Sequence, residues 1–556
     1  MPTNRATFRS PTPRLTLLVV GVLSACSAAH AQLREPEVLV IYDSRISDSR
    51  LVAEHYAGSA KVPGGLGGVA GAHPSVLTLD LSTLAAVGSA GPAGFSAVTP
   101  DISYSNFDTQ LRGPLRAYLT AQNLTRRVRS IVTTRGLPHR IQSIANPTIG
   151  DNPGMVGNSL CDGQLTYASV DIELALLWQS FDAGENGAQG SSYSEGWMMN
   201  PFWRQTVPQA GWPRSYITTS PETLTVPTDN VGCTSNAGVW WNIAQPISPS
   251  TPTSLTPGDM YMVCRIDGNS VALANAIVDR AQNLVLNTST SAFVFNSSTD
   301  YPYALEGGGG LPEFDNGPDY YQTSNLLTSD GRFVASNVTF IAGTGLSNFI
   351  VGPNISFAPN TPTVISSPIL LLASYGANFD GYSAGGVPSP MNTTYANSFN
   401  YAPGAVFNTI ESYNGRAFGG NGQNIYAPQQ QAADALANGC TFAVCNVWEP
   451  TTITIADNYF IVQNFFLGNL SWAEAAYSAL PAISWSQMVV GDPLARVRRD
   501  SEDINGDGKL TIDDLYAWYA SPKDLNHDGS ANATDYSLLE AAVRGPELVN
   551  MKGDQR

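Results

Sequence analysis

Oxygen-bearing side chains recur at a fixed spacing in two twelve-residue segments near the C-terminus. Residues 503–514 read DINGDGKLTIDD and residues 524–535 read DLNHDGSANATD, so the segments start 21 residues apart. Each places Asp, Asn or Thr at positions 1, 3, 5, 9 and 12 and Gly at position 6, which is the pattern of a calcium-binding loop. Ca²⁺ prefers hard oxygen ligands, and a residue without Cβ makes the sharp bend at position 6. The sequence therefore predicts two calcium sites.

The predicted ligands are the side chains at those five positions and the main-chain carbonyl at position 7. They are Asp503, Asn505, Asp507, Lys509, Thr511 and Asp514 in the first loop, and Asp524, Asn526, Asp528, Ser530, Asn532 and Asp535 in the second. Residues 500–540 hold ten Asp or Glu and only two Lys. A bound cation would neutralise this repulsion, whereas a metal-free pair of Asp-Asn-Gly turns would leave it in place.

Position 12 is Asp in both loops rather than the longer Glu of calcium sensors, and an apolar stretch typical of a helix follows each loop (515–519 and 536–543). This duplicated arrangement resembles the dockerin family. The resemblance implies a small all-α, EF-hand-like module over residues 498–545, followed by a tail (546–556), and a cohesin-like partner. Positions 10 and 11 read Ile512-Asp513 and Ala533-Thr534 instead of the usual Ser/Thr pair. Whether the module binds a partner or its own chain stays open.

The N-terminus has the features of an export signal. Three Arg residues precede the apolar run Leu15–Leu23, and small residues follow up to Ala29-His30-Ala31. This order predicts a signal peptide over residues 1–31. An alternative is the lipobox-like Leu23-Ser24-Ala25-Cys26, in which Cys26 would be lipidated. Both readings predict a secreted, extracellular or periplasmic protein.

Charge and hydropathy exclude two classes of partner. The net charge is −17 and the mature region has no cluster of Lys and Arg beyond residues 126–129, so we expect no nucleic-acid binding. No apolar stretch of about 18 residues is present after the signal, and the apolar run within it is itself too short, so we expect no transmembrane segment.

Between residues 32 and 497, short apolar runs alternate with helical patterns. Expected strands are 38–42, 130–133, 260–264, 292–295, 369–373, 406–410 and 442–447. Expected helices begin near Ser47 or Asp48 and cover 111–121, 271–284, 429–437, 459–466 and 472–479. This alternation predicts an α/β domain with a mainly parallel sheet and helices on both faces. Two stretches near 185–258, rich in Trp, and 297–335 are expected to be insertions at a sheet edge.

Carboxylates near strand ends are the candidates for catalysis in this large domain. Asp43 and Asp380 follow expected strands, and Asp267 and Glu449 lie close behind others. Open α/β sheets bind ligands at the carboxyl ends of their strands. These four residues could serve a carbohydrate-active hydrolase, and the Trp residues of the first insertion could stack against a polysaccharide.

Nucleophilic catalysis has weaker support. Ser383 stands in a literal G-x-S-x-G, but two prolines follow where a helix is required, and the only later His lies in a calcium loop. Export and cleavage after residue 31 would leave five Cys. We expect Cys264 to be a buried thiol within a strand, and Cys161–Cys233 with Cys440–Cys445 is the preferred of three pairings for the others.

Seven short segments of the large domain occur in an order that resembles a family of exported bacterial proteins from genomes with exosortase-type sorting systems. They are Ser47-Asp48-Ser49, Thr133-Thr134-Arg135-Gly136-Leu137-Pro138, Arg265-Ile266-Asp267-Gly268, Ser374-Tyr375-Gly376-Ala377-Asn378, Pro403-Gly404-Ala405-Val406, Glu449-Pro450 and Gly491-Asp492-Pro493-Leu494. The resemblance implies no known activity.

The strand order and the closing Gly-Asp-Pro are also distantly similar to the caspase-like fold of gingipain-type cysteine peptidases. In that family a His and a Cys follow two successive strands. Here the matching positions read Ser374-Tyr375-Gly376 and Glu411-Ser412-Tyr413. With neither His nor Cys, we expect no cysteine-peptidase activity. The leading interpretation is a secreted calcium-binding component for assembly or attachment, and the alternative is an extracellular hydrolase tethered through the dockerin-like module.

Overall fold

The computed structural model describes most of the large domain and nearly all of the tail module. The described residues are 33–84, 101–103, 106–142, 168–178, 198–203, 257–297, 319–343, 345–354, 362–376, 395–411, 413–418, 432–448, 455–468, 470–483, 486–507 and 509–548. Cys161, Cys233, Asp380, Ser383, Glu449 and most of the expected insertion 185–258 lie outside these residues.

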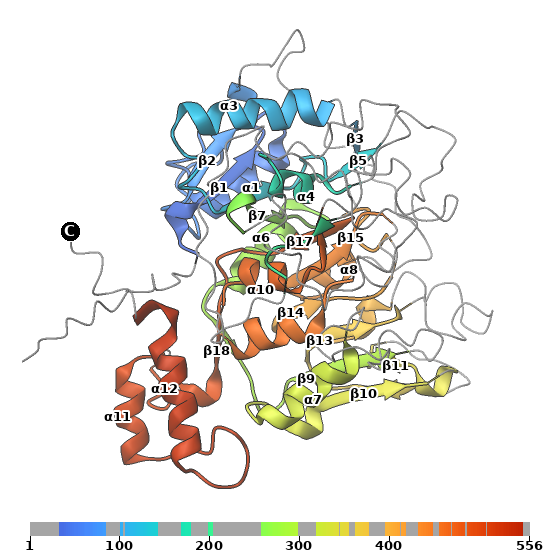
Figure 1. Ribbon diagram of the computed structural model, residues 1–556, viewed down its shortest axis with the longest axis vertical. Helices are drawn as coiled ribbons and strands as arrows, with labels where there is room; N and C mark the ends of the chain where they lie inside the picture. The colour runs from blue at the N-terminus through green and yellow to red at the C-terminus, as the bar shows by residue number, and fades with distance from the viewer. Residues whose placement is uncertain are drawn as a thin grey trace, which may run out of the picture.

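A ten-stranded sheet runs through the large domain (Figure 1), in the order β10-β9-β13-β14-β15-β17-β7-β4-β1-β2. Every neighbouring pair is parallel except β15 and β17. The strands are β1 (Val38–Tyr42), β2 (Leu77–Asp80), β4 (Ser130–Thr134), β7 (Met262–Ile266), β9 (Ala292–Ser297), β10 (Val338–Ala342), β13 (Ile369–Ser374), β14 (Tyr401–Phe407), β15 (Phe442–Asn446) and β17 (Gln487–Val490).

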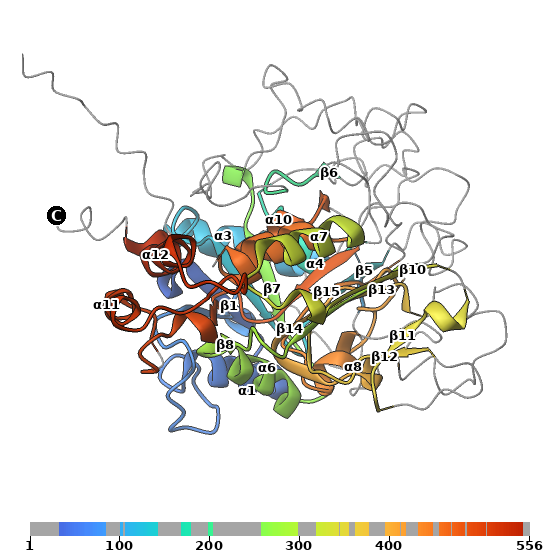
Figure 2. The ribbon, with the colours of Figure 1, turned by 90° about the horizontal axis from the view of Figure 1, so that it is seen from below.

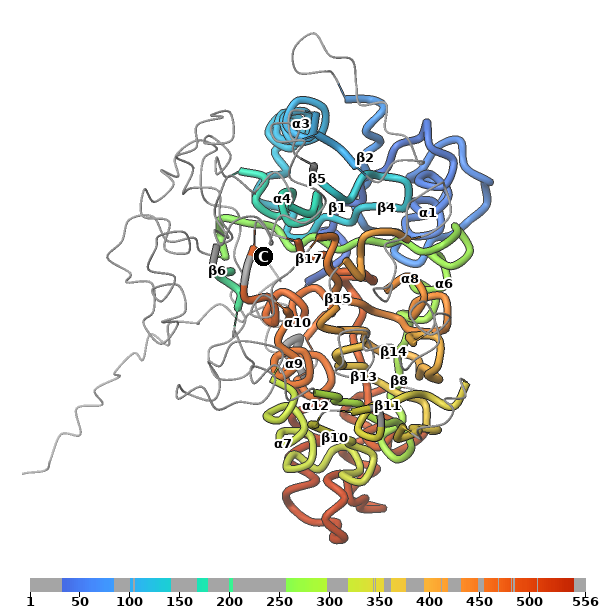
Figure 3. Tube along the Cα trace, turned by 90° about the vertical axis from the view of Figure 1, so that its right-hand side faces the viewer, coloured from blue at the N-terminus to red at the C-terminus, as the bar shows by residue number. Residues whose placement is uncertain are grey.

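Helices cover both faces of this sheet (Figure 3), which confirms the predicted α/β class. One face carries α1 (Ser47–Ala57), α6 (Val271–Ala281) and α8 (Ala432–Ala437). The other carries α3 (Gly113–Ala121), α4 (Val170–Ala175), α7 (Tyr320–Asp330), α9 (Asn458–Ile461) and α10 (Trp472–Ala479). Strands β1, β4, β7, β9, β13 and β15 are buried at every residue, as continuous apolar runs between two helical layers must be.

Several boundaries differ from those expected. Strand β7 starts and ends two residues later than its apolar run, and β14 starts at Tyr401 instead of Val406. A π-helical turn, η3 (Phe107–Arg112), leads directly into α3, and another, η17 (Val462–Leu467), directly follows α9. The expected insertion 297–335 includes α7, which connects β9 to β10 as an ordinary crossover, so that part belongs to the alternating fold.

Cys440 and Cys445 are free and buried, and the expected disulfide between them is wrong. Cys445 lies within β15, and five residues of nearly extended chain span about 16 Å, which exceeds the reach of a disulfide. Cys264 is a free thiol buried within β7, as expected. Burial raises the pKa of both the Cys264 and the Cys440 thiols, that of Cys440 to about 12, so neither is a ready nucleophile.

Four two-stranded sheets complete the large domain: β3 (Asp101–Ser103) with β5 (Arg140–Gln142), β6 (Met198–Met199) with β16 (Ala482–Ile483), β11 (Ile350–Val351) with β12 (Thr363–Val364), and β8 (Leu284–Leu286) with β18 (Val497–Arg499). The chain then forms α11 (Ile512–Ala520) and α12 (Ala533–Leu548), which lie side by side at one end of the molecule (Figures 1 and 2). Among the described residues, the helices are too short or too polar to cross a lipid bilayer.

Candidate functional site

The last residue of each predicted calcium loop closes that loop on its own backbone. Asp514 is fully buried, and its Oδ1 accepts hydrogen bonds from the amides of Ile504 (2.9 Å) and Asn505 (3.4 Å), while its Oδ2 accepts from Thr511 (2.7 Å). The carboxylate thereby joins the start of the loop to position 9.

Asp535 repeats this arrangement in the second loop. It is also fully buried, and it accepts from the amides of Leu525 (2.7 Å), Asn526 (3.1 Å) and Asn532 (2.7 Å). The donors occupy loop positions 2, 3 and 9, as in the first loop. Two segments of different sequence thus reach the same closed conformation through the same position-12 Asp.

Side-chain to backbone hydrogen bonds also shape the front half of both loops. The position-1 carboxylate of Asp503 accepts from the amide of Gly506 at position 4, whereas that of Asp524 accepts from the amide of Gly529 at position 6, both at 2.8 Å. The position-5 carboxylates of Asp507 and Asp528 accept from the position-7 amides, also at 2.8 Å. Position 4 is left-handed in both loops, with φ of +73° at Gly506 and +55° at His527. At position 6, Gly529 has φ of +90°, and Gly508 lies outside the described residues.

In the part of the chain that the structure describes, no three His, Cys, Asp or Glu side chains form a group that could hold a metal ion. Each loop nevertheless combines Asp at positions 1, 5 and 12 with Asn at position 3 and Thr or Asn at position 9. All are hard oxygen donors suited to Ca²⁺, so the donor chemistry fits that ion, and the calcium sites remain a prediction.

A small core of its own holds the two helices together. Trp518, Leu525 and Leu539 are buried there, and Trp518 Nε1 donates to the carbonyl of Lys523 (3.2 Å). One face of α11 is exposed at Ile512 (57%), Tyr516 (66%) and Tyr519 (66%). The spacing i, i+4, i+7 places these three apolar side chains on one side of the helix.

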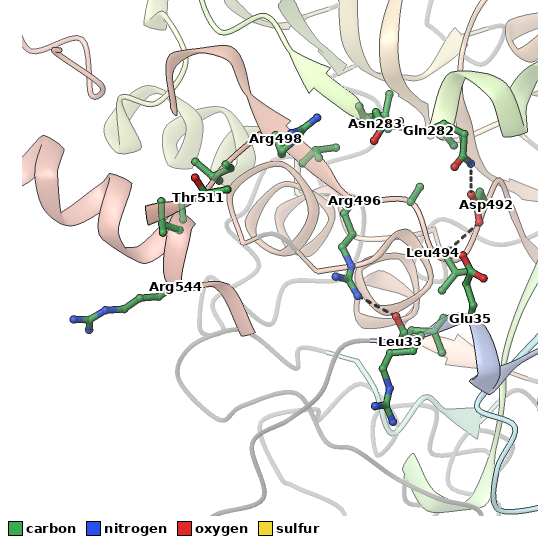
Figure 4. Close-up of a pocket in the computed structure, with 18 of the residues that line it drawn as sticks. Leu33, Glu35, Gln282, Asn283, Asp492, Leu494, Arg496, Arg498, Thr511 and Arg544 are labelled. Carbon is green, nitrogen blue, oxygen red and sulfur yellow. Dashed lines mark hydrogen bonds between the residues drawn. The ribbon is translucent and has the colours of Figure 1, made fainter. Parts of the chain in front are cut away.

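The module joins the large domain through ordered contacts. Strand β18 pairs in parallel with β8, and Asp500 Oδ1 accepts from the amide (2.9 Å) and the hydroxyl (2.7 Å) of Thr288. Arg499, which is buried, binds Glu502 (Nε–Oε1 2.6 Å). A cleft of about 1180 Å³ lies between the two parts and is lined by Arg496, Arg498 and Thr511 among others (Figure 4).

Two of the four candidate carboxylates in the large domain are described, and both are held by arginine. Asp43 is fully buried and accepts two bonds from the Arg45 guanidinium, Nε–Oδ1 at 2.8 Å and Nη2–Oδ2 at 2.5 Å. Asp267 is buried and contacts Arg135 (3.2 Å) and Arg265 (3.5 Å). Burial raises the pKa of Asp267, while both guanidiniums oppose that rise. Asp380 and Glu449 lie outside the described residues.

The sequence motifs around these carboxylates converge at the carboxyl ends of β1, β4 and β7. Ser49 Oγ accepts a hydrogen bond from the amide of Asp43 (2.9 Å) and forms another with the Thr134 hydroxyl (2.8 Å). Arg135 Nε binds Asp48 Oδ2 (3.0 Å) and its guanidinium reaches the Gly268 carbonyl. These polar residues bind one another, which is typical of side chains that hold neighbouring strands and helices together. Among the described residues here, no two carboxylates face each other as a catalytic pair would.

Sequence reasoning missed the most buried ion pair of this region. Arg265 is fully buried and binds Asp171 through Nε–Oδ2 (2.8 Å) and Nη2–Oδ1 (3.0 Å), and its guanidinium also donates to the carbonyls of Leu137 and Pro138. An Arg directly after the expected strand 260–264 was the available signal, because β7 extends to Ile266 and a buried charge requires a partner. His139 is also fully buried, and burial with two nearby Arg lowers its pKa well below the usual value.

The ends of β13 and β14 meet at Gly376 and Glu411, within the two segments compared with caspase-like peptidases in the sequence. Gly376 has φ of +51°, and a Cβ there would overlap the carboxyl group of Glu411. Glu411 is fully buried, and its Oε2 accepts from the Thr409 hydroxyl (2.7 Å). A buried carboxylate therefore lies against Gly376, just beyond the end of β13.

A second buried cluster surrounds the closing Gly-Asp-Pro motif. Asp492 is fully buried and accepts from Tyr56 Oη (2.7 Å), His73 Nε2 (2.6 Å) and Gln282 Nε2 (3.1 Å). Figure 4 shows Asp492 and Gln282 joined by a hydrogen bond among the residues that line the cleft. Burial lowers the pKa of His73, but Asp492 and Glu35 outweigh it and the net pKa is raised. The motif thus ties the end of the sheet to α1 and α6.

No protein-family model, curated protein or solved structure matches the chain. Functional inference therefore depends on the geometry of the sites themselves.

Proposed function

We propose that this chain is an exported protein whose tail binds two calcium ions, one in each of the loops 503–514 and 524–535, and serves assembly or attachment. The observation that carries the proposal is the shared closure of the two loops by Asp514 and Asp535. Different sequences reach the same hydrogen-bond pattern, and both present the oxygen donors that Ca²⁺ prefers. Calcium would supply the positive charge that offsets the carboxylate repulsion in each loop.

The proposal extends to the class of module and scaffold. Two helices with loop-closing Asp residues support a dockerin-like, EF-hand-like module, and the exposed face Ile512, Tyr516 and Tyr519 supports a cohesin-like or other protein partner. A large, mostly parallel sheet with helices on both faces supports a caspase-like scaffold. Export rests on the signal-like residues 1–31, with lipidation at Cys26 as the alternative route.

The hydrolase alternative has less support in the described residues. Asp43 and Asp267 each bind arginine in a buried network, so neither is placed as a general acid or base facing substrate. A polysaccharide partner has no described aromatic platform in the large domain, where Trp203 of the expected insertion is buried.

Limited proteolysis with and without calcium tests the proposal. Calcium should protect the tail of the full chain, and replacing both Asp503 and Asp524 by Ala should abolish that protection while the large domain stays intact. The matched control is Asp513→Asn, because Asp513 is an exposed carboxylate of the first loop that is not a predicted ligand. Calcium protection unchanged in the double variant would contradict the assignment of these ligands.

A further inference from the structure

The second calcium loop lies against the large domain at the end of α7. Helix α7 ends at Asp330, and Gly331 caps it with a φ of +80°. A Cβ on Gly331 would overlap the main-chain carbonyl oxygen of Asn526, which is position 3 of loop 524–535. The close approach therefore requires glycine, both for its conformation and for the missing Cβ.

Neighbouring side chains fix the position of Gly331. Asp330 and Arg332 form a two-point ion pair, with Nε–Oδ1 at 2.6 Å and Nη2–Oδ2 at 2.8 Å. Arg332 Nη1 also donates to the carbonyl of Leu467 (2.7 Å), at the end of η17. The turn that meets the loop is thus anchored to a second element of the large domain.

The backbone that contacts Gly331 is the same backbone that closes the loop. The amides of Leu525 and Asn526 both donate to Asp535 Oδ1, and Leu525 is 1% exposed in the module core. A displacement of Asn526 would therefore move predicted ligands at position 3 and position 12 together. Through this short chain of contacts, α7 and the loop geometry depend on one another.

Resting on the calcium function proposed above, we infer that loop 524–535 uses α7 as an intramolecular partner: calcium in this loop and docking of the module on Gly331 stabilise each other. Linkage makes the effect reciprocal, so calcium should order the end of α7, and the contact should tighten calcium binding. The segment that leads into loop 503–514 is held by a different contact: the Arg499 guanidinium donates to the carbonyl of Phe466 (2.5 Å) and also binds Glu502. The contact with Gly331 is made by Asn526 of the second loop, so we assign the coupling to that loop.

Hydrogen exchange of the full chain tests this coupling. Calcium should slow exchange of the amides in the last turn of α7, Leu326–Asp330. The slowing should persist in Asp503→Ala and be lost in Asp524→Ala, because only the latter removes a ligand from the second loop. Exchange in α7 that is insensitive to calcium, in a protein that calorimetry shows to bind two ions, would overturn the coupling but leave the calcium function standing.

Calcium titration of Gly331→Ala supplies the reciprocal test. One of the two sites should weaken by about tenfold, within the usual range of coupling between sites. Gly68→Ala is the matched control, because Gly68 also has a positive φ (+75°) but a Cβ there meets nothing within 4 Å. If Gly331→Ala and Gly68→Ala bind calcium with the same affinities, the inference is wrong. If the unaltered chain binds no calcium, the proposed function itself is wrong.

Discussion

At the residue scale, several buried charges among the described residues of the large domain have geometrically matched partners, which favours a structural role for them. Arg265 shows this most fully: its guanidinium binds Asp171 at two points and two main-chain carbonyls, with neither side chain exposed by more than 1%. Removing one member of such a pair leaves an uncompensated charge in a medium that cannot solvate it.

Replacing Arg265 by Met should therefore lower the free energy of unfolding by about 3–5 kcal/mol, the usual cost of breaking a buried pair. Urea denaturation of the full chain, followed by tryptophan fluorescence, measures this change. Arg544→Ala is the control: its pair with Glu540 is exposed (70% at the Arg side chain), and such pairs contribute about 0–1 kcal/mol. Similar losses in the two variants would show that the Arg265 network is not buried as described.

The His73–Asp492 pair should make stability depend on pH in two directions. The pKa of His73 is raised in the folded protein. Its contribution to stability is therefore complete at pH values below the pKa of His in the unfolded chain, and it is lost as pH rises through the pKa of His73 in the folded protein. The pKa of Asp492 is lowered because His73 and Tyr56 outweigh the effect of burial. The contribution of Asp492 to stability is present at pH values above the pKa of Asp in the unfolded chain, and it is lost as pH falls through the pKa of Asp492 in the folded protein.

The stability difference between the unaltered chain and His73→Gln should consequently be largest between the unfolded pKa values of Asp and His, at about pH 4–6.5. It should shrink on the alkaline side as His73 loses its proton. Thermal unfolding over a pH series measures the difference, with His55→Gln as control, because His55 binds a mostly exposed Asp279 (62% exposed). A difference that grows above neutral pH would contradict the ion pair.

At the element scale, a tyrosine side chain supplements the backbone pairing between strands β17 and β7. Strands β17 and β7 share a single backbone pair, Val490 with Arg265. Beside that pair, the Tyr477 hydroxyl of α10 accepts from the amide of Val263 (2.7 Å) and donates to its carbonyl (3.2 Å). A helix side chain thus takes the place of a neighbouring strand at this position of β7.

Tyr477→Phe should destabilise the protein by about 1–3 kcal/mol, because it leaves a buried amide and carbonyl of β7 without their partner. It should also accelerate hydrogen exchange at the Val263 amide. Tyr516→Phe, which changes an exposed hydroxyl on α11, is the matched control and should have little effect. Unaltered exchange at Val263 in Tyr477→Phe would show that another group satisfies this strand edge.

Sequence reasoning identified elements well where one pattern dominated and poorly where two competed. Continuous apolar runs such as Val38–Tyr42 and Ile369–Ala373 became buried strands. Strand β14 starts at Tyr401, five residues before the expected Val406, and it includes Pro403-Gly404, a pair that is typical of turns. In the structure Gly404 has φ of +89° inside the strand, and the register of β13 shifts between Ile369 and Leu371. A Pro-Gly irregularity within a strand cannot be told from a turn by composition.

At the scale of the whole molecule, strand order and docking depend on contacts between residues far apart in the chain. The α/β class followed from the alternation of patterns, but the antiparallel pairing of β15 with β17 and the contact of Asn526 with Gly331 have no local signature. The candidate sites also differ in whether their residues are close together in the sequence or meet only in the folded chain. Loop residues are contiguous and were recognised by spacing, whereas Asp171 and Arg265 are 94 residues apart and meet only in the fold.

Binding of two calcium ions by the two loops of the tail can be counted directly by native mass spectrometry of the full chain, recorded after removal of metals and again with added calcium. We expect a mass increase of two calcium ions, reduced to one in Asp503→Ala and in Asp524→Ala and to none in the double variant. A chain that gains no calcium, or gains two ions equally in the double variant, would contradict the claim.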